Sequence, residues 1–432
     1  MNHTHGHSSP RRDAEAEANA CASAGNPLLG TPDFDALRTR AHNLRWATVA
    51  ADVIPLTAAD PDLPVASPII DAITAYVRTP HLSYGPAAGI PEFGAAVARH
   101  FKTTKDATVA SARVIATNSA ASGITLVARH LLKSGDEVVV QDPVDFLVAE
   151  SARRAGATLR FWRADAGRWT AEGLRAAITP ATRAVFVCSP HNPVGALWTP
   201  AEVSAIAAVA SEYQLILVSD EVWSDVVLDG RPFRSFAAHA QEACRAWVVY
   251  GLSKGFGLAG LRIGAVIAPT ATDAEQFQEA QGFRHTIEGV STVSQIAAIA
   301  ALEQCGPWLQ AFLAHCAAQR DFARRRLCAL PGVELACAPM GTFVLFFKIS
   351  GTGLSEEVLA ERIETYARVR VVPGSPRWFG AGAAGHIRLS LATTRAVLDD
   401  ALTRIEAAWP TIVALGDRRP ASTGSEAEID DV

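Results

Sequence analysis

The sequence predicts an α/β fold, with a large domain in which a mostly parallel seven-stranded sheet lies between helices, and a smaller α+β domain. At 432 residues the chain is long enough for two or three domains. Short apolar runs alternate with Ala-rich helical stretches through the middle of the chain, which is typical of a parallel sheet covered on both faces. The pattern changes after about residue 305, where a second kind of domain is therefore expected.

Seven apolar runs are the predicted strands of the large sheet, and they cover 113–117, 137–140, 158–161, 184–188, 215–219, 247–250 and 263–268. Helical stretches separate most of these runs, for example 121–132, 146–155 and 200–212. A strand followed by a helix and another strand favours parallel pairing, because the helix carries the chain back across the sheet.

The last third of the chain predicts the smaller domain. Its expected elements are a helix at 307–329, a strand pair around 333–348, a helix near 355–367 and a strand at 386–391. We predict that residues 28–70 complete this domain together with 301–414, that the large domain spans 71–300, and that one long helix near 276–305 bridges the two. Residues 1–27 and 415–432 are polar and aperiodic, and we predict a disordered leader and tail.

Composition argues against several classes of function. The net charge is −5 and no Lys/Arg stripe is present, so nucleic-acid binding is not expected. No apolar run approaches the roughly 18 residues of a membrane span. The seven cysteines form no CxxC pair, which indicates reduced thiols and a cytoplasmic protein. No metal site is predicted; His3, His5 and His7 are read as part of the leader.

The segment Gly251–Gly264 carries the clearest chemical signal. Within it, Gly255-x-Gly257-x-x-Gly260 follows a strand and mimics a dinucleotide-binding fingerprint. That fingerprint requires a helix to begin at the glycines. Only two residues remain here before the next apolar run at 263–268, so the segment has no room for a helix and the dinucleotide interpretation fails.

Lys254 lies in the same segment, directly after an apolar strand. The chain has only five lysines, and the other four (102, 105, 133 and 348) are predicted to face solvent. A lysine that forms a Schiff base must lose its proton near neutral pH, which burial favours. Arg262 could supply a cation for a phosphate. We therefore predict that Lys254 carries pyridoxal 5′-phosphate (PLP); a lysine buried by chance is the alternative.

Three other strand ends support this hypothesis. Asn192, in the turn Ser189-Pro-His-Asn-Pro-Val-Gly195, could donate to a ring oxygen, or could be an ordinary turn residue. Asp220 ends an apolar strand and could keep a pyridine nitrogen protonated, or could cap a helix. Thr117–Gly123 begins a helix whose backbone N–H groups could bind a phosphate, or could be simply capped.

With these motifs the chain resembles the class I/II aminotransferase superfamily of fold-type I PLP enzymes over roughly residues 44–410. The resemblance implies that Lys254, Asp220 and Tyr84 are catalytic and that Arg388 and Asn192 bind the substrate. It also implies a shared set of cofactor-binding residues, namely Lys254, Asp220, Asn192, Ser119, Ala120, Ala121, Phe146, Trp223, Ser253, Arg262 and Tyr84. Tyr84 would reach the phosphate of a partner subunit, which implies a homodimer.

Within that superfamily, three stretches resemble the cystathionine β-lyase branch of C–S lyases. They are Arg45-Trp46 with Ala59–Pro64, the turn Pro190–Gly195, and Ser219–Asp225. The resemblance implies a C–S β-lyase that cleaves a cysteine S-conjugate or a cystathionine-like amino acid by α,β-elimination, in specialised metabolism. The alternatives are an aminotransferase, oxidative or decarboxylative PLP chemistry on an unusual amino acid, and a non-catalytic PLP-fold regulator. The segment around Tyr84 is closer to the aminotransferases.

Four positions depart from the family pattern. Trp223 stands where the aminotransferases carry Tyr and the lyases commonly His, and its indole N–H is a donor only. Asp145 occupies the place expected for the aromatic residue that stacks on the cofactor ring, so Phe146 is predicted to stack instead. Gly251 replaces a common phosphate-binding Ser, and Gly341-Thr-Phe differs from the lyases. These departures indicate a specialised member.

Overall fold

The computed structural model describes residues 26–165, 167–240, 242–285 and 287–414. The predicted leader, apart from residues 26 and 27, and the predicted tail lie outside these residues, as do His3, His5 and His7. Within the described ranges, no helix is both long and apolar enough to cross a bilayer.

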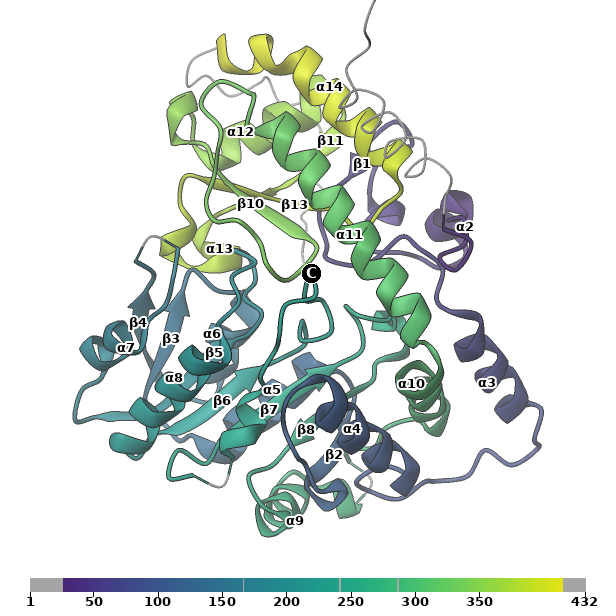
Figure 1. Cartoon of the computed structure of the whole chain (residues 1–432), viewed down its shortest axis with the longest axis vertical. Helices are drawn as coiled ribbons and strands as arrows, with labels where there is room; N and C mark the ends of the chain where they lie inside the picture. Colours follow the sequence, from purple (N-terminus) through teal and green to yellow (C-terminus); the bar gives the residue numbers. More distant parts are fainter. Residues whose placement is uncertain (1–25, 166, 241, 286, 415–432) are drawn as a thin grey trace, which may run out of the picture.

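The centre of the large part is a seven-stranded sheet with the strand order β2-β8-β7-β6-β5-β3-β4 (Figure 1). The strands are β2 (Val114–Thr117), β3 (Glu137–Asp142), β4 (Thr158–Arg163), β5 (Thr182–Cys188), β6 (Ile216–Asp220), β7 (Trp247–Gly251) and β8 (Gly264–Ile267). Only β8 runs antiparallel to its neighbours, β2 and β7, while the other pairs are parallel. The predicted mostly parallel seven-stranded sheet is confirmed.

β8 is antiparallel because the connection from β7 holds no helix that could carry the chain back across the sheet. Between the two strands the described chain forms turns and one short 3₁₀ helix at Ala259–Leu261. Antiparallel neighbours can be joined by such a short connection, whereas parallel neighbours need a crossover. The rejection of a dinucleotide fingerprint in this segment is thereby confirmed.

Helices pack around this sheet and against one another. They are α3 (Ser67–Val77), α4 (Pro91–Thr104), α5 (Ala120–Leu131), α6 (Phe146–Arg154), α7 (Ala171–Ala177), α8 (Pro200–Glu212), α9 (Ala271–Ala280) and α10 (Thr292–Gln304). α5 contacts β7, β8 and α6, and α8 contacts β6 and α7. A capping box at Thr199 and Glu202 together with Pro200 explains why α8 begins at the predicted residue.

The smaller part combines a four-stranded antiparallel sheet with a separate parallel strand pair. The sheet has the order β12 (Val372–Pro373), β13 (His386–Ser390), β10 (Val344–Lys348) and β9 (Glu334–Leu335), and the pair is β1 (Ile54–Pro55) with β11 (Val369–Arg370). Its helices are α2 (Phe34–Thr39), α11 (Gly306–Leu327), α12 (Glu356–Arg362), α13 (Pro376–Phe379) and α14 (Arg395–Ala414). The pairing of β1 with β11 brings the N-terminal segment into contact with the C-terminal third.

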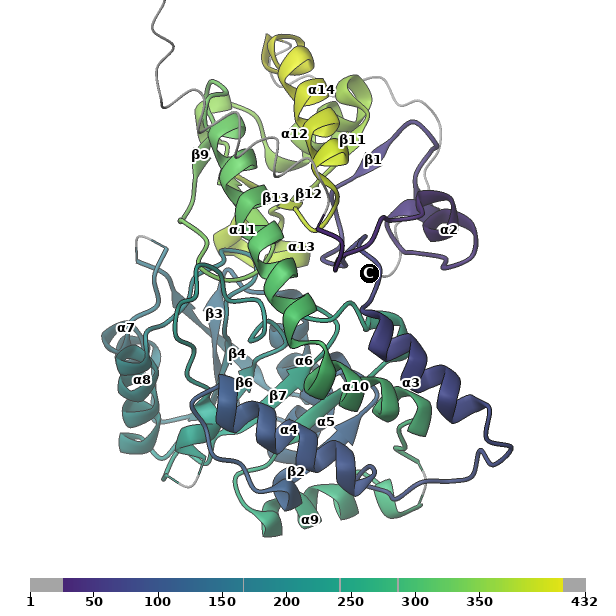
Figure 2. The same cartoon turned by 45° about the vertical axis from the view of Figure 1, so that its right-hand side comes forward.

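The single bridging helix predicted near 276–305 is wrong. The structure has α9 ending at Ala280 and α10 beginning at Thr292. Gly282 adopts a φ of +77°, a left-handed conformation that ends a regular helix and that glycine adopts at low cost. The connection between the two parts is instead α11, whose Phe312 joins the larger hydrophobic core and whose Leu327 joins the smaller one. Figures 1 and 2 show α11 running from the small part to the side of the sheet.

The predicted domain boundaries fall inside helices. The boundary at 70/71 lies within α3 and the boundary at 300/301 lies within α10. These two helices contact each other, and Ile69 and Ala301 both belong to the larger core. The boundaries stay a prediction, and both helices lie with the large part of the molecule.

Candidate active site

Lys254 lies in the turn that follows β7, with its amine inside the protein. Its Nζ donates a hydrogen bond to the backbone oxygen of Ala59 at 2.7 Å and lies 5.5 Å from the centre of the Trp223 ring. Burial lowers the pKa of Lys254, while nearby carboxylates, Asp60 first, oppose this shift. A buried amine with a lowered pKa loses its proton more readily, which is what a nucleophilic lysine requires.

Two more predicted residues meet Lys254 because three parallel strands end at the same edge. In the register of the sheet, Cys188 of β5 pairs with Asp220 of β6, and Asp220 pairs with Val249 of β7. Asn192 follows β5, Asp220 ends β6 and Lys254 follows β7. The carboxyl ends of parallel strands form the usual ligand-binding edge of such a sheet.

Asp220 is buried, with 7% of its surface exposed, and its Oδ1 accepts a hydrogen bond from the Val222 N–H at 3.0 Å. Burial raises the pKa of Asp220 to about 7, from an ordinary value of 3.8. A neighbouring pyridinium would favour the ionised form and lower this pKa again, because opposite charges stabilise each other. Asp220 therefore fits a cationic ring nitrogen.

The raised pKa predicts a pH-dependent stability for the protein stripped of cofactor. Between about pH 4 and pH 7 folded Asp220 keeps a proton that the unfolded chain releases, so the free energy of unfolding falls as pH rises. Asp220→Asn has no carboxyl to titrate, so its free energy of unfolding does not fall in this way, and its amide oxygen can still accept from the Val222 N–H. We expect the cofactor-free variant to exceed the wild type in stability by up to about 4 kcal/mol near pH 8, and to match it near pH 4. Urea unfolding across this range measures the difference, and a pH-independent difference would contradict the assignment.

Arg388 reaches the same site from β13 in the small part of the molecule. Its guanidinium donates to Oδ1 of Asn192 at 3.3 Å and to the backbone oxygen of Thr57 at 3.0 Å, and it lies 5.1 Å from the centre of the Phe379 ring. Burial lowers the pKa of Arg388 to about 10, and Asp145 opposes the shift. The group stays cationic at neutral pH and holds its planar donors at fixed positions, as bidentate binding of a carboxylate requires.

Asp145, predicted only as a departure from the family pattern, also belongs to this cluster. Its Oδ2 accepts a hydrogen bond from the Asn192 side chain at 2.7 Å, and its Oδ1 caps α6 by accepting from the Leu147 N–H at 3.1 Å. Burial raises the pKa of Asp145. An Asp just before an apolar helical run is a capping signal, and that signal could have placed it at the helix start.

The N-terminus of α5 forms an anion cradle. Arg262 donates to Oγ of Ser119 at 3.0 Å, and Ser119 caps the helix. Ser119 has a φ of +130° and Arg262 a φ of +50°, conformations that L-residues rarely adopt and that concentrate at functional sites. Ala120 and Ala121 occupy the first helical turn, where N–H groups have no acceptor within the helix. These features fit a phosphate.

Gly251 is required by this cradle. A Cβ at position 251 would lie 2.9 Å from Cγ2 of Val222 and 3.1 Å from Cβ of Ala120. A side chain at position 251 would therefore force Val222 and the start of α5 to shift. This close packing favours glycine over serine here.

The two predicted aromatic neighbours of the cofactor lie in different environments. Trp223 is buried beside Lys254 and packs edge-on against Phe343 at 4.8 Å between ring centres. Phe146 begins α6 and packs edge-on against Trp378 of α13 at 5.8 Å. Stacking of Phe146 on a cofactor ring stays a prediction.

Tyr84 and Ser253 complete the predicted set. Ser253 is half-buried next to Lys254. Tyr84 lies in the segment between α3 and α4, and its side chain is 94% exposed. The single chain therefore does not bring Tyr84 into the buried cluster, and its role toward a partner subunit stays a prediction.

The prediction that Lys105 faces solvent is wrong. Its Nζ is buried, donates to the backbone oxygen of Ser224 at 2.6 Å and forms an ion pair with Asp225. Asp225 also accepts from the Tyr250 hydroxyl at 2.6 Å and contacts His100 at 2.7 Å. Burial alone would raise the pKa of Asp225, but Lys105 and His100 hold it well below its ordinary value.

This buried cluster supports the turn that carries Trp223. A Cβ on Gly255 would lie 2.6 Å from Cβ of Asp225, so the same carboxylate also packs against the lysine turn. The sequence contains a pattern that predicts the burial of Lys105. Phe93, Val97 and Phe101 recur every four residues on the buried face of α4, and position 105 continues this series.

Comparison with known proteins finds a matching family model, two similar relatives and a similar solved structure. The family model described as "Aminotransferase class I and II" matches residues 51–405. An aspartate aminotransferase of Pyrococcus horikoshii is 30% identical over 367 residues, which cover 84% of this chain and 92% of the relative. An arginine–pyruvate transaminase of Pseudomonas aeruginosa is 31% identical over 357 residues, which cover 82% and 89%. The solved structure of an aromatic aminotransferase from Pyrococcus horikoshii is 28% identical, covers 85% of this chain and 98% of its own, and superposes with a TM-score of 0.76.

Proposed function

The chain belongs to the aminotransferase class I and II family, and on that premise we propose that it is an aminotransferase that takes the amino group from an amino acid. It is a PLP-dependent enzyme of fold type I, as the resemblance implied. The observation that carries the proposal is that two relatives, whose alignments cover 84% and 82% of this chain, are named as an aminotransferase and a transaminase. This observation favours the transamination alternative over the predicted C–S β-lyase.

The described residues fit PLP. The cradle at Ser119, Ala120 and Ala121, with Arg262 and Ser253, would hold the phosphate. Asp220 would face the ring nitrogen and Asn192 the ring hydroxyl, and Lys254 would link to the aldehyde. When bound, the cofactor supplies an electron sink for the electron pair left when a bond at the substrate Cα breaks.

The residues of the chain bind the substrate, move the proton at Cα and keep the ring nitrogen protonated. Arg388 binds the substrate carboxylate and so fixes the position of Cα. Lys254 takes the proton from Cα and holds it near the reacting atoms, which its lowered pKa favours. Asp220 keeps the pyridine nitrogen protonated. Trp223, packed against Phe343, covers the lysine turn and cannot itself relay a proton.

Elimination of a β-thiolate is the second candidate, because it uses the same residues at Cα. All three lyase-like stretches lie at the site: Ala59 and Asp60 border Lys254, Asn192 borders Arg388, and the stretch 219–225 contributes Asp220 and Trp223. His191, in the lyase-like turn, stacks on Trp169 at 4.0 Å between ring centres, and burial lowers its pKa to about 3. His191 is therefore a neutral packing residue, which gives no separate support to the lyase.

A pair of assays separates the two candidates. The holoenzyme is mixed with an amino acid and a 2-oxo acid, and the new amino acid is measured. In parallel it is mixed with S-substituted cysteines without any 2-oxo acid, and pyruvate and free thiol are measured. We expect turnover only in the first assay. Sustained release of pyruvate and thiol in the second would overturn the aminotransferase proposal in favour of the C–S β-lyase.

Replacing Arg388 by glutamine is expected to raise the KM for the amino acid about 100-fold or more. The variant loses charge-assisted hydrogen bonds to the substrate carboxylate, which contribute about 1.5–3 kcal/mol each. Steady-state kinetics measures the change, and Arg324→Gln, at an exposed position on α11, is the matched control. An unchanged KM would show that the carboxylate binds elsewhere.

We also propose that the enzyme is a cytoplasmic homodimer. Tyr84 and Leu82 are 94% and 68% exposed in the single chain, and Ile70 and Val77 of the adjoining α3 are also exposed, which favours a covered apolar surface. The six cysteines among the described residues carry free thiols, as expected in a reducing compartment.

A further inference from the structure

The segment Thr57–Asp60 lies against both residues that would hold the substrate. The backbone oxygen of Thr57 accepts a hydrogen bond from Arg388 at 3.0 Å, and the backbone oxygen of Ala59 accepts one from Lys254 at 2.7 Å. A substrate whose carboxylate binds Arg388 and whose Cα faces Lys254 therefore lies beside this segment. Asp60 is its only charged side chain.

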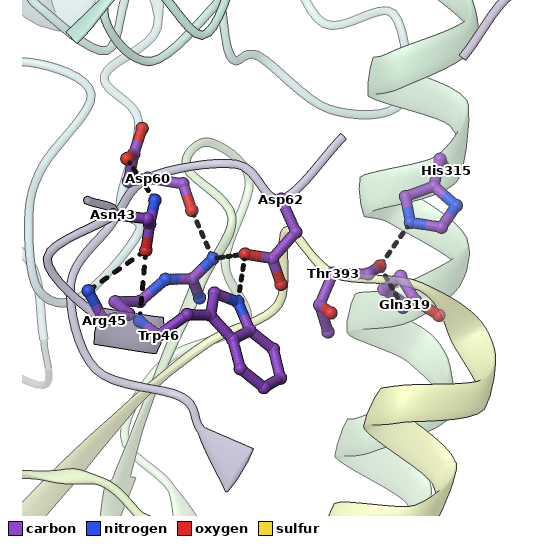
Figure 3. Close-up of polar contacts among 8 residues, drawn as sticks. All are labelled: Asn43, Arg45, Trp46, Asp60, Asp62, His315, Gln319 and Thr393. Atoms are coloured by element: carbon purple, nitrogen blue, oxygen red, sulfur yellow. Dashed lines mark hydrogen bonds and ion pairs between the residues drawn. The ribbon is translucent and has the colours of Figure 1, made fainter. Parts of the chain in front are cut away.

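The carboxylate of Asp60 has a neutral partner. Its Oδ2 accepts a hydrogen bond from the amide of Asn43 at 3.0 Å, as Figure 3 shows. Among the described residues no Lys, Arg or His nitrogen lies within ion-pair distance of this carboxylate. Burial raises the pKa of Asp60, and Lys254 is the cation that most opposes the shift. When Lys254 gives up its proton, this compensating charge is lost.

A buried network holds Asp60 in place. Arg45 donates to the backbone oxygen of Asp60 at 2.6 Å and pairs with Asp62, and both of these side chains are fully buried. The indole of Trp46 donates to the same Asp62 carboxylate at 2.7 Å (Figure 3). The Asp62 N–H donates to the backbone oxygen of Ala392 at 2.8 Å, which ties the segment to the strand end beyond Arg388. A carboxylate fixed in this way loses little freedom when it binds a ligand.

The charges around the site favour a cation at the far end of the substrate. Asp60 and Asp145 both lie near Lys254, and Asp145 also lies near Arg388; neither carboxylate is within ion-pair distance of a cation in the described residues. The carboxylate of the substrate takes the charge of Arg388. A second carboxylate on the substrate would then meet like charges, whereas a guanidinium or ammonium would meet opposite ones.

We propose that Asp60 is a specificity residue that binds the cationic end of the substrate side chain, so that the preferred amino donors are basic amino acids. The proposal rests on the proposed function for the orientation of the substrate on Arg388 and Lys254. It goes beyond that function by naming the class of donor and the residue that selects it.

Equilibrium binding to the holoenzyme tests this proposal without turnover. The probes are three carboxylic acids that lack an α-amino group: 5-guanidinopentanoate (cationic), hexanoate (neutral) and glutarate (anionic). Calorimetry is expected to show the guanidino acid binding about 10-fold or more tighter than hexanoate, and glutarate binding weakest. Asp60→Asn should abolish the guanidino preference and leave hexanoate binding unchanged. Asp35→Asn, at an exposed position of α2, is the matched control.

Rapid mixing of the holoenzyme with arginine and with its neutral isostere citrulline gives a second readout. Asp60→Asn is expected to slow the loss of the lysine-bound cofactor absorption about 10-fold or more with arginine, and little with citrulline. Equal slowing with both would assign Asp60 a role for every substrate and overturn the proposal. Tightest wild-type binding of glutarate or hexanoate would overturn it too, even if the variant does not fold. If the guanidino acid binds tightest but no amino acid removes the lysine-bound cofactor absorption, the proposed function alone is overturned.

Discussion

Replacing Lys254 by alanine is expected to remove the visible absorption of the lysine-bound cofactor and to lower the transamination rate by at least about 10⁴-fold. Lys254 is the buried amine at the carboxyl edge of the sheet, and it has two tasks. It anchors the cofactor, and it moves the proton at Cα. Alanine performs neither, whereas the anion cradle at Ser119 and Arg262 remains and should still bind the phosphate.

The absorption spectrum and single-turnover rates measure this effect. Lys102→Ala is the matched control because Lys102 is exposed on α4, and it should behave as the wild type. Retention of the lysine-bound spectrum in Lys254→Ala would mean that another lysine carries the cofactor. Among the described residues Lys105 is the most deeply buried lysine, and its amine is already paired with Asp225.

Asp220→Asn is expected to lower kcat by about 10²–10³-fold, the usual effect of removing one fixed electrostatic partner of the reacting group. A carboxylate keeps the pyridine nitrogen protonated, and a neutral amide does not. The variant should still fold, because the amide oxygen replaces the acceptor of the Val222 N–H. Steady-state kinetics measures the loss, with Asp71→Asn, exposed on α3, as the control.

Asp220→Asn is expected to raise the stability of the cofactor-free protein but to lower kcat. This opposition distinguishes a partner of the ring nitrogen from a residue that only supports the fold. Without cofactor the buried carboxyl destabilises the fold above its ordinary pKa, so its removal stabilises the protein. With cofactor the same carboxylate gains a cationic partner, so its removal costs activity. A variant that lost both activity and cofactor-free stability near pH 8 would show a structural role for Asp220 instead.

Most of the large sheet was predictable because its signal is local. Strands buried on both faces read as continuous apolar runs, and each predicted run contains or overlaps a strand of the sheet. Lys254, Asp220 and Asn192 could also be predicted from the sequence, because each lies at the end of such a run or shortly after it. The helix predicted at 276–305 failed because an Ala-rich stretch does not show that Gly282 takes a left-handed conformation.

Other residues were misjudged because their partners are distant in sequence. Lys105 was taken for a surface lysine, yet it pairs with Asp225, 120 residues away. Asp145 was read as the absence of an aromatic ring, yet it is the hydrogen-bond partner of Asn192. The position of Asp60 beside Lys254 depends on a contact across 195 residues, between Ala59 and Lys254.

The sequence by itself determined the cofactor, because the strand, the turn and the lysine are neighbours along the chain. Only the tertiary structure decided which carboxylates surround that lysine. Asp60 arrives with the N-terminal segment that Arg45 and Asp62 hold in place, and Asp145 arrives with the cap of α6. Charges act through space rather than along the chain, so the choice of substrate depends on contacts that no local pattern records.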